Sequence, residues 1–110
     1  MNKKKINKYL PLTESSAYIL LALKEPLHGY GVMQKVTDMS KGTVTVGAGT
    51  LYTAFSTLEK QQLIEKAGQE GRRKLYVLTK FGRAVLAEHI HHTEILVENA
   101  RALGISNGSL

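Results

Sequence analysis

The sequence predicts a mainly α (α+β) fold: a winged helix-turn-helix with a two-stranded wing and a long C-terminal dimerisation helix. Three observations lead to this prediction. Apolar residues recur at helical spacing in three segments before residue 63. Two strand-like runs then flank a glycine-containing turn, which is the pattern of a hairpin. A last amphipathic helical pattern occupies residues 80–103.

Capping residues and chain breakers set the boundaries of these elements. Thr13 can cap the first helix, and Pro26 closes it because a proline disfavours helical geometry in the residue before it. Gly42 is a natural stop for the second helix, and Thr50 can cap the third. Glycines at 68 and 71 supply the hairpin turn. In chain order, the expected elements are helices over 13–24 and 28–39, a short strand over 43–46, a helix over 50–62, strands over 63–67 and 72–78, and a helix over 80–103.

The helix over 50–62 has one apolar and one hydroxyl-rich face. Leu51, Phe55 and Leu58 follow helical spacing, so they predict the buried side. The opposite side is almost neutral and carries Tyr52, Thr53, Ser56, Thr57 and Lys60. This face is therefore the candidate binding surface.

The last helix is long for so small a chain. Its 24 residues would span roughly 36 Å, more than a three-helix core of this size can cover. The apolar side from Ile90 onward is therefore expected to pack on a second copy of the same helix. The alternative is that this end folds back on its own domain. The predicted dimer interface consists of Ile90, Thr93, Leu96, Val97, Ala100 and Leu103.

Positive charge gathers in two parts of the chain. The net charge is +6 over 110 residues, with +4 in residues 1–13 and +5 in residues 66–83. Such separation is typical of proteins that bind a polyanion, although a solvated, solubilising face is the alternative. The expected organisation is a basic arm over 1–11, the winged helix-turn-helix over 12–79, the dimerisation helix over 80–103 and a flexible tail over 104–110.

Several classes of protein are disfavoured by what the sequence lacks. It has no Cys and no G-x-S-x-G or phosphate-loop motif, so no enzyme activity and no cofactor are expected. His89 and His92 would share a helix face, but no third ligand is fixed by spacing, so no metal site is predicted beside His91. The basic N-terminus lacks a signal-peptide apolar run, and the apolar run over 17–23 is too short for a bilayer. We expect a cytoplasmic protein that does not contact membranes.

Three segments together resemble the PadR family of bacterial transcriptional regulators. They are HGYGVMQKV at 28–36, VGAGTLYTAFSTLEKQQLIEK at 46–66 and GRRKLYVLTKFG at 71–82. They occur in that family's order and spacing, and the resemblance covers about Leu12 to Gly82. It implies a homodimeric repressor whose recognition helix begins at Thr50 and whose wing is the 67–78 hairpin. The short chain is similar to the branch with a single helix after the wing, several members of which answer to small hydrophobic ligands at or near the dimer interface.

The sequence also departs from that family's pattern. Ala48 stands where Pro is frequent, Thr53 where a basic residue such as Arg is common, and Gln62 where Gly is frequent. The sequence has no Trp on the last helix, where members with a flat drug-stacking pocket can use one. An effector pocket is instead expected beside Tyr9 and Tyr18, between the first helix and the partner's last helix, unless both residues only pack in the core.

Binding to duplex DNA divides between affinity and sequence choice. Arg72, Arg73 and Lys74 are expected to contact phosphates, and Lys3, Lys4 and Lys5 to add to them as a mobile arm. Hydroxyl groups of the helix can read base edges, and Tyr52 can reach a phosphate. The predicted helix contacts are Thr50, Tyr52, Thr53, Ser56, Thr57 and Lys60.

Each assignment has an alternative. Tyr52 could only cover the junction between helices, the hydroxyl residues could be solvated surface, and Arg72 and Arg73 could be solubilising turn residues. The partners expected are a pseudo-palindromic operator, a second copy of the chain and a small-molecule effector. The alternatives are a protein-interaction module that meets an acidic partner, and a small-molecule or metal carrier on the same scaffold.

Overall fold

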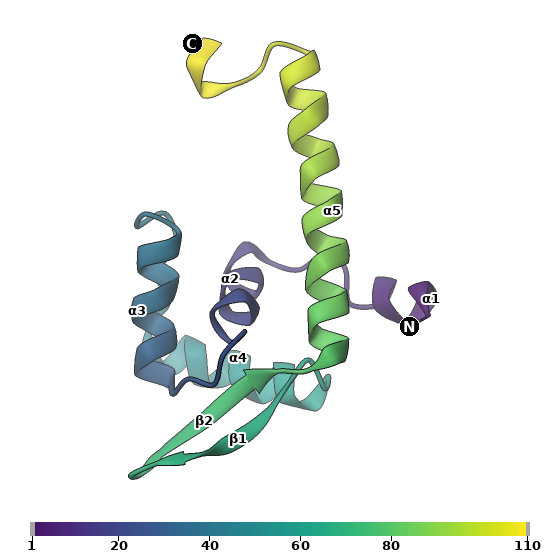
Figure 1. Cartoon of the computed structure of the whole chain (residues 1–110). Helices are drawn as coiled ribbons and strands as arrows, with labels where there is room; N and C mark the ends of the chain where they lie inside the picture. The colour runs from purple at the N-terminus through teal and green to yellow at the C-terminus, as the bar shows by residue number, and fades with distance from the viewer. Residues whose placement is uncertain (1, 110) are drawn as a thin grey trace.

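The computed structural model describes residues 2–109 and forms a winged helix-turn-helix with a long final helix (Figure 1). Within that range no helix is both long and apolar enough to cross a membrane. The elements are α1 (Lys3–Asn7), α2 (Glu14–Ala22), α3 (Gly29–Met39), α4 (Ala48–Lys60), β1 (Ile64–Glu70), β2 (Arg73–Leu78), α5 (Lys80–Ala102) and the 3-10 helix η1 (Asn107–Ser109).

The core lies where α2, α3, α4 and the start of α5 meet. Leu20, Val32, Leu51 and Val85 are fully buried, each from a different one of these helices. The predicted apolar face of α4 is confirmed, because Leu51, Phe55 and Leu58 are all buried. Thr13 caps α2 as predicted, since its side chain accepts a hydrogen bond from the Ser16 N–H at 3.0 Å.

The wing has a third strand-like partner, and it is not the short strand predicted over residues 43–46. Residues 43–46 form no strand; they are an irregular connection with Val44 and Val46 buried. Leu27, between α2 and α3, instead pairs with Tyr76 of β2 through two backbone hydrogen bonds of 3.1 and 3.0 Å. The β-branched residues at 44 and 46 are therefore explained by core packing rather than by a sheet.

A buried serine holds the connection between α3 and α4. Ser40 Oγ accepts from the Val44 N–H at 3.0 Å and lies 3.1 Å from the Val44 carbonyl oxygen, to which it can donate. Thr43 Oγ1 donates to the Ser40 carbonyl at 2.7 Å. Because these groups satisfy one another, Ser40 and Val44 can be buried at the two ends of an exposed turn without orphaned polar atoms. Helix α3 ends at Met39 with Ser40 as its C-cap, and the left-handed region is entered already at Lys41 (φ +53°), so Gly42 (φ +78°) follows the stop that was predicted there.

The start of α4 and the length of the wing also differ from prediction. The helix begins at Ala48 with Gly47 as its N-cap, so Thr50 lies in the first turn and does not cap it. Strand β1 continues to Glu70 past an irregularity between Lys66 and Gln69, where Gly68 has φ +106°. The predicted turn at 68–71 thus shortens to Gly71–Arg72, and the wing is a longer ribbon with a bulge.

Gln62 occupies the left-handed region with φ +62°. Glycine adopts this geometry with little strain, whereas in other residues the Cβ crowds the backbone. The departure noted at this position therefore has a structural meaning: Gln62 is strained where a glycine would not be. Thr79 Oγ1 donates to the Gln62 carbonyl at 2.7 Å and helps to hold this conformation.

The N-terminal segment is folded rather than a mobile arm. Residues 3–7 form α1, and Ile6 is buried. Lys5 Nζ lies 5.2 Å from the centroid of the Phe81 ring, so α1 packs beside the start of α5. The expectation of a mobile arm is therefore corrected. The helix was not predicted because a single apolar residue, Ile6, makes no helical pattern in the sequence.

Helix α5 rises away from the rest of the molecule (Figure 1). The Cα radius of gyration is 15.3 Å, against about 13 Å for a compact chain of this length. Its distal half does not fold back on the domain, which removes that alternative. After it, the tail expected to be flexible includes one turn of 3-10 helix.

Gly82 is the position where the fold tolerates a side chain least. A Cβ there would overlap the Leu63 carbonyl oxygen and lie 2.8 Å from Leu78 Cδ1. We expect Gly82→Ala to lower the free energy of unfolding by about 2 kcal/mol, because the overlapping atom belongs to the backbone and cannot rotate away. Urea denaturation measures this. Gly49→Ala on α4 is the matched control: a Cβ there meets nothing within 4 Å, so stability should be unchanged or slightly raised. Equal stability of the two variants would contradict this packing.

Candidate nucleic-acid interface

The outer face of α4 is exposed and carries the residues predicted to read DNA. Thr50, Tyr52, Thr53, Ser56, Thr57 and Lys60 are all exposed. Thr53 Oγ1 donates to the Gly49 carbonyl at 3.1 Å, so its hydroxyl proton is used within the helix. Its remaining lone pairs and its methyl group still face outward. This surface offers hydroxyl groups and methyl groups, with one cation at its C-terminal end.

The wing places three cations side by side at its tip. Arg72 lies in the turn, and Arg73 and Lys74 begin β2; all three are exposed. Within residues 2–109 none of them forms an ion pair, although Glu70 stands opposite Arg73 in the strand register. Within that range, therefore, no acidic side chain neutralises these three charges at short distance.

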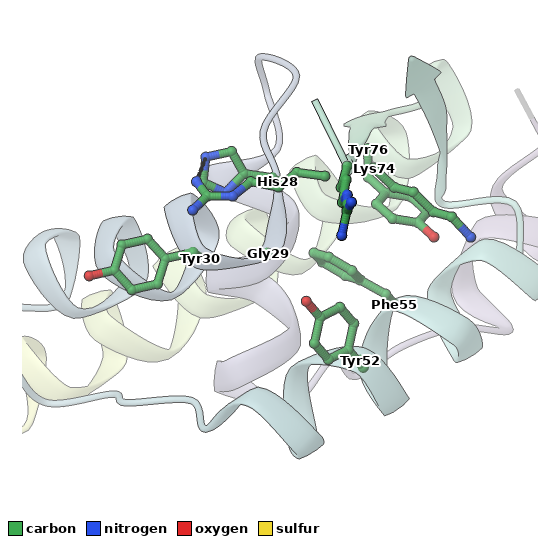
Figure 2. A pocket seen from close by; sticks show the side chains of 9 residues that line it. His28, Gly29, Tyr30, Tyr52, Phe55, Lys74 and Tyr76 are labelled. Atoms are coloured by element: carbon green, nitrogen blue, oxygen red, sulfur yellow. Dashed lines mark hydrogen bonds between the residues drawn. The ribbon is translucent and has the colours of Figure 1, made fainter. Parts of the chain in front are cut away.

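A cleft of about 400 Å³ lies between the tip of the wing, the start of α3 and α4 (Figure 2). Aromatic rings form its floor: Phe55 packs on Tyr76 at 4.8 Å between centroids and meets Tyr52 edge-on at 6.3 Å. Tyr52 lies at the junction between α3 and α4 and keeps 63% of its surface exposed, while its hydroxyl points toward Gly29 at the start of α3 (Figure 2). The lining residues are His28, Gly29, Tyr30, Tyr52, Phe55, Arg72, Arg73, Lys74 and Tyr76.

His28 is a residue of this cleft that was not predicted as a site residue. Its Nδ1 accepts the Gly31 N–H at 3.1 Å and caps α3. Its Nε2 lies 3.3 Å from Nη1 of Arg73, so the imidazole connects the helix to the wing. The signal in the sequence was the position of a histidine immediately before the first helical glycine, where a side chain can accept from the residue three positions on.

The three lysines of the arm are not brought together with the wing. Lys3, Lys4 and Lys5 are exposed on α1. Figure 1 shows α1 and the tip of the wing on opposite sides of the base of α5. Any contact of these lysines with DNA would therefore be separate from that of Arg72 and Arg73.

The predicted dimer face is uncovered in the protomer. Leu96 and Leu103 keep 69% and 76% of their surface exposed, and Ile90 and Val97 keep 41% each. Thr93 is exposed beside them, and Ala100 is half-buried. Ile95 and Ile105 are also exposed, at 43% and 68%, and were not predicted.

A hollow of about 390 Å³ lies between α2 and α5. Tyr18 lines it, together with Ala17, Leu21 and Ile90. Tyr9 does not; its ring packs edge-on against Phe81, 5.6 Å between centroids. Of the two tyrosines expected beside an effector pocket, Tyr18 therefore borders this hollow and Tyr9 does not.

Two of the three histidines of α5 contact protein groups through a ring nitrogen. His89 Nδ1 accepts from the Leu12 N–H at 3.4 Å, and His92 Nε2 lies 3.1 Å from Glu88 Oε1. Across residues 2–109, no three His, Cys, Asp or Glu side chains come close enough together to hold a metal ion.

Comparisons with known proteins agree with this architecture. Residues 19–88 match the model of the transcriptional regulator PadR-like family. An uncharacterised protein of Lysinibacillus sphaericus is 31% identical over 77 residues, which are 66% of this chain and 71% of that protein. The transcriptional regulator YqjI of Escherichia coli is 28% identical over 79 residues, 72% of this chain but only 38% of YqjI.

A solved structure supports the same assignment. A PadR family transcriptional regulator from Eggerthella lenta is 26% identical, with a TM-score of 0.70, over 94% of this chain and 88% of that one. The family model covers more than half of the sequence and includes α3, α4, the wing and the start of α5. The chain therefore belongs to the PadR-like family, whose members are transcriptional regulators and not enzymes.

Proposed function

We propose that this protein is a homodimeric, sequence-specific DNA-binding repressor that a small hydrophobic or aromatic effector releases from its operator. The observation that carries the proposal is the exposed, nearly neutral face of α4 beside the wing cations, which form no ion pair with any residue from 2 to 109. The two surfaces have the different chemistries that base reading and phosphate binding need. Membership of a family of transcriptional regulators supports the same reading.

The wing supplies affinity and the helix supplies sequence choice. Each cation that neutralises a phosphate releases condensed counterions, which favours binding to any duplex. Ser56 and Thr57 can donate to or accept from base edges, and the Thr53 methyl can meet a thymine methyl. Because no bidentate arginine lies on this face, each base contact discriminates less than the roughly 1–3 kcal/mol of a good bidentate pair. An operator with two half-sites compensates by using the face twice.

The distal half of α5 has the spacing of a helix-pairing surface. Thr93, Leu96, Ala100 and Leu103 follow a 3-4-3 spacing, which places them on one side of the helix as in a coiled coil. An exposed apolar stripe of this kind is costly in water unless a partner covers it. A second α5 would cover it and would fix the separation of the two α4 helices, near 34–36 Å for half-sites one turn apart.

The hollow beside Tyr18 is the proposed effector site. Its lining includes Ile90 and Thr93, two residues of the proposed dimer face, so a ligand there would bear on the pairing of the α5 helices. A change in that pairing would alter the distance between the two reading helices. Operator and effector would then weaken each other's binding by the same factor.

The wing arginines can be tested by a salt titration on duplex DNA. We expect Arg72→Ala/Arg73→Ala to weaken binding to operator and random duplex alike. It should also reduce the slope of log K against log salt by about 1.8, because each phosphate that is no longer neutralised accounts for about 0.9 of that slope. Fluorescence anisotropy with labelled duplex at several salt concentrations measures both.

The control is Arg83→Ala/Arg101→Ala, which removes the same charge from exposed positions on α5. It should leave the slope close to wild type. An unchanged slope in the wing variant would remove Arg72 and Arg73 from phosphate binding. Absence of any duplex binding by the wild-type protein would favour a protein-interaction module.

The dimer face can be tested without disturbing the core. We expect Leu96→Glu to convert the dimer to a folded monomer, because Leu96 is 69% exposed in the protomer and lies outside the core. Light scattering coupled to size-exclusion chromatography measures the mass. His91→Glu places the same charge about 140° around the helix from Leu96 and should remain dimeric. A Leu96→Glu protein with wild-type mass would overturn the assignment of this face.

A further inference from the structure

The two contacts made by His28 require incompatible roles of its neutral imidazole. Nδ1 accepts the Gly31 N–H, so it carries a lone pair and the ring proton must sit on Nε2. Nε2 is the atom that lies 3.3 Å from the Arg73 guanidinium, and a guanidinium can only donate. In the tautomer that caps α3, two donors therefore face each other with no acceptor between them.

The other tautomer would reverse the problem. If Nε2 accepted from Arg73, Nδ1 would carry the proton and would confront the Gly31 N–H, leaving the first turn of α3 without its cap. Arg73 is exposed, so water can accept from its guanidinium, whereas the Gly31 N–H is partly buried in the first turn of α3 and would lose its acceptor. The capping tautomer is thus the one that the surroundings favour.

Two donors about 3.3 Å apart can both be satisfied by one oxygen placed beside them. The surroundings suit an anion: the charge of Arg73 is adjacent, Lys74 lines the same cleft, and α3 directs the positive end of its dipole there. Tyr52 brings a further hydroxyl near the start of α3, whereas the Tyr30 hydroxyl points away and meets Gln34 (Figure 2).

We propose that His28 and Arg73 together bind one backbone phosphate of duplex DNA, with Nε2–H of His28 and the Arg73 guanidinium donating to it. This inference rests on the proposed DNA-binding function and deepens it. It makes His28 both the cap of α3 and a phosphate ligand, so the contact would lock the wing to the helix-turn-helix when DNA is bound. The contact would fix register rather than read sequence, because a phosphate carries no base identity.

The tautomer can be tested in the free protein. Nitrogen-15 NMR of the histidine side chains, with His28 assigned through His28→Asn, should show the ring proton of the neutral form on Nε2. A neutral ring that carries its proton only on Nδ1 would overturn the proposal, because its Nε2 would then have no proton to donate.

The phosphate contact can be tested with His28→Asn. Asparagine caps helices well but is too short to reach the Arg73 side, so thermal stability should hold. Affinity for operator and random duplex should each fall about tenfold, the decrease expected for a hydrogen bond to a charged group. Ethylation of single phosphates should identify one phosphate in each half-site whose modification weakens binding by the wild-type protein more than binding by the variant, which contacts that phosphate through Arg73 alone.

A double-mutant cycle separates a shared phosphate from independent effects. His28→Asn combined with Arg73→Gln should weaken binding by less than the sum of the single effects, whereas its combination with Lys74→Gln should be additive. Additive effects with Arg73→Gln, or wild-type affinity in His28→Asn, would overturn this inference while leaving the proposed function intact. If the wild-type protein binds no duplex, both fail together.

Discussion

The reciprocal backbone pairing of Leu27 with Tyr76 is the contact on which the functional surface depends. Each residue donates its N–H to the other's carbonyl, at 3.1 and 3.0 Å. The pair fastens the middle of β2 to the connection between α2 and α3, just before α3 begins. A two-stranded ribbon alone is only marginally stable in water, so this pairing gives the wing a defined place beside the helices. This pairing also explains why residues from three separate parts of the chain line one cleft. Once Leu27 is fixed to Tyr76, the next residue, His28, faces the wing and can both cap α3 and approach Arg73.

Phe55 of α4 packs on the Tyr76 ring and adds a second attachment to the wing. The wing, α3 and α4 are thereby held as one unit. A protein that must match the spacing of phosphates and bases needs its contact residues held in this way.

Periodic patterns made much of this fold predictable. The spacing of Leu51, Phe55 and Leu58 identified the buried side of α4, and the glycines near residue 70 identified the hairpin. Non-periodic features were missed. The valines at 44 and 46 resembled a strand, but their burial depends on the network around Ser40, which involves residues outside any single periodic segment. The candidate site was likewise predictable in outline and not in its connections. Exposed hydroxyl residues on α4 and cations on the wing follow from spacing and charge alone, whereas the role of His28 depends on a distance across 45 positions of the chain, which no local pattern contains.

The central claim is that α4 and the wing bind a specific DNA sequence as a pair of half-sites. Hydroxyl-radical footprinting on the DNA upstream of the protein's own gene, in excess nonspecific competitor, tests it most directly. We expect two protected segments related by a dyad and about one helical turn, roughly 10–10.5 base pairs, apart. Protection that spreads evenly along the duplex, or that disappears with competitor, would contradict the claim.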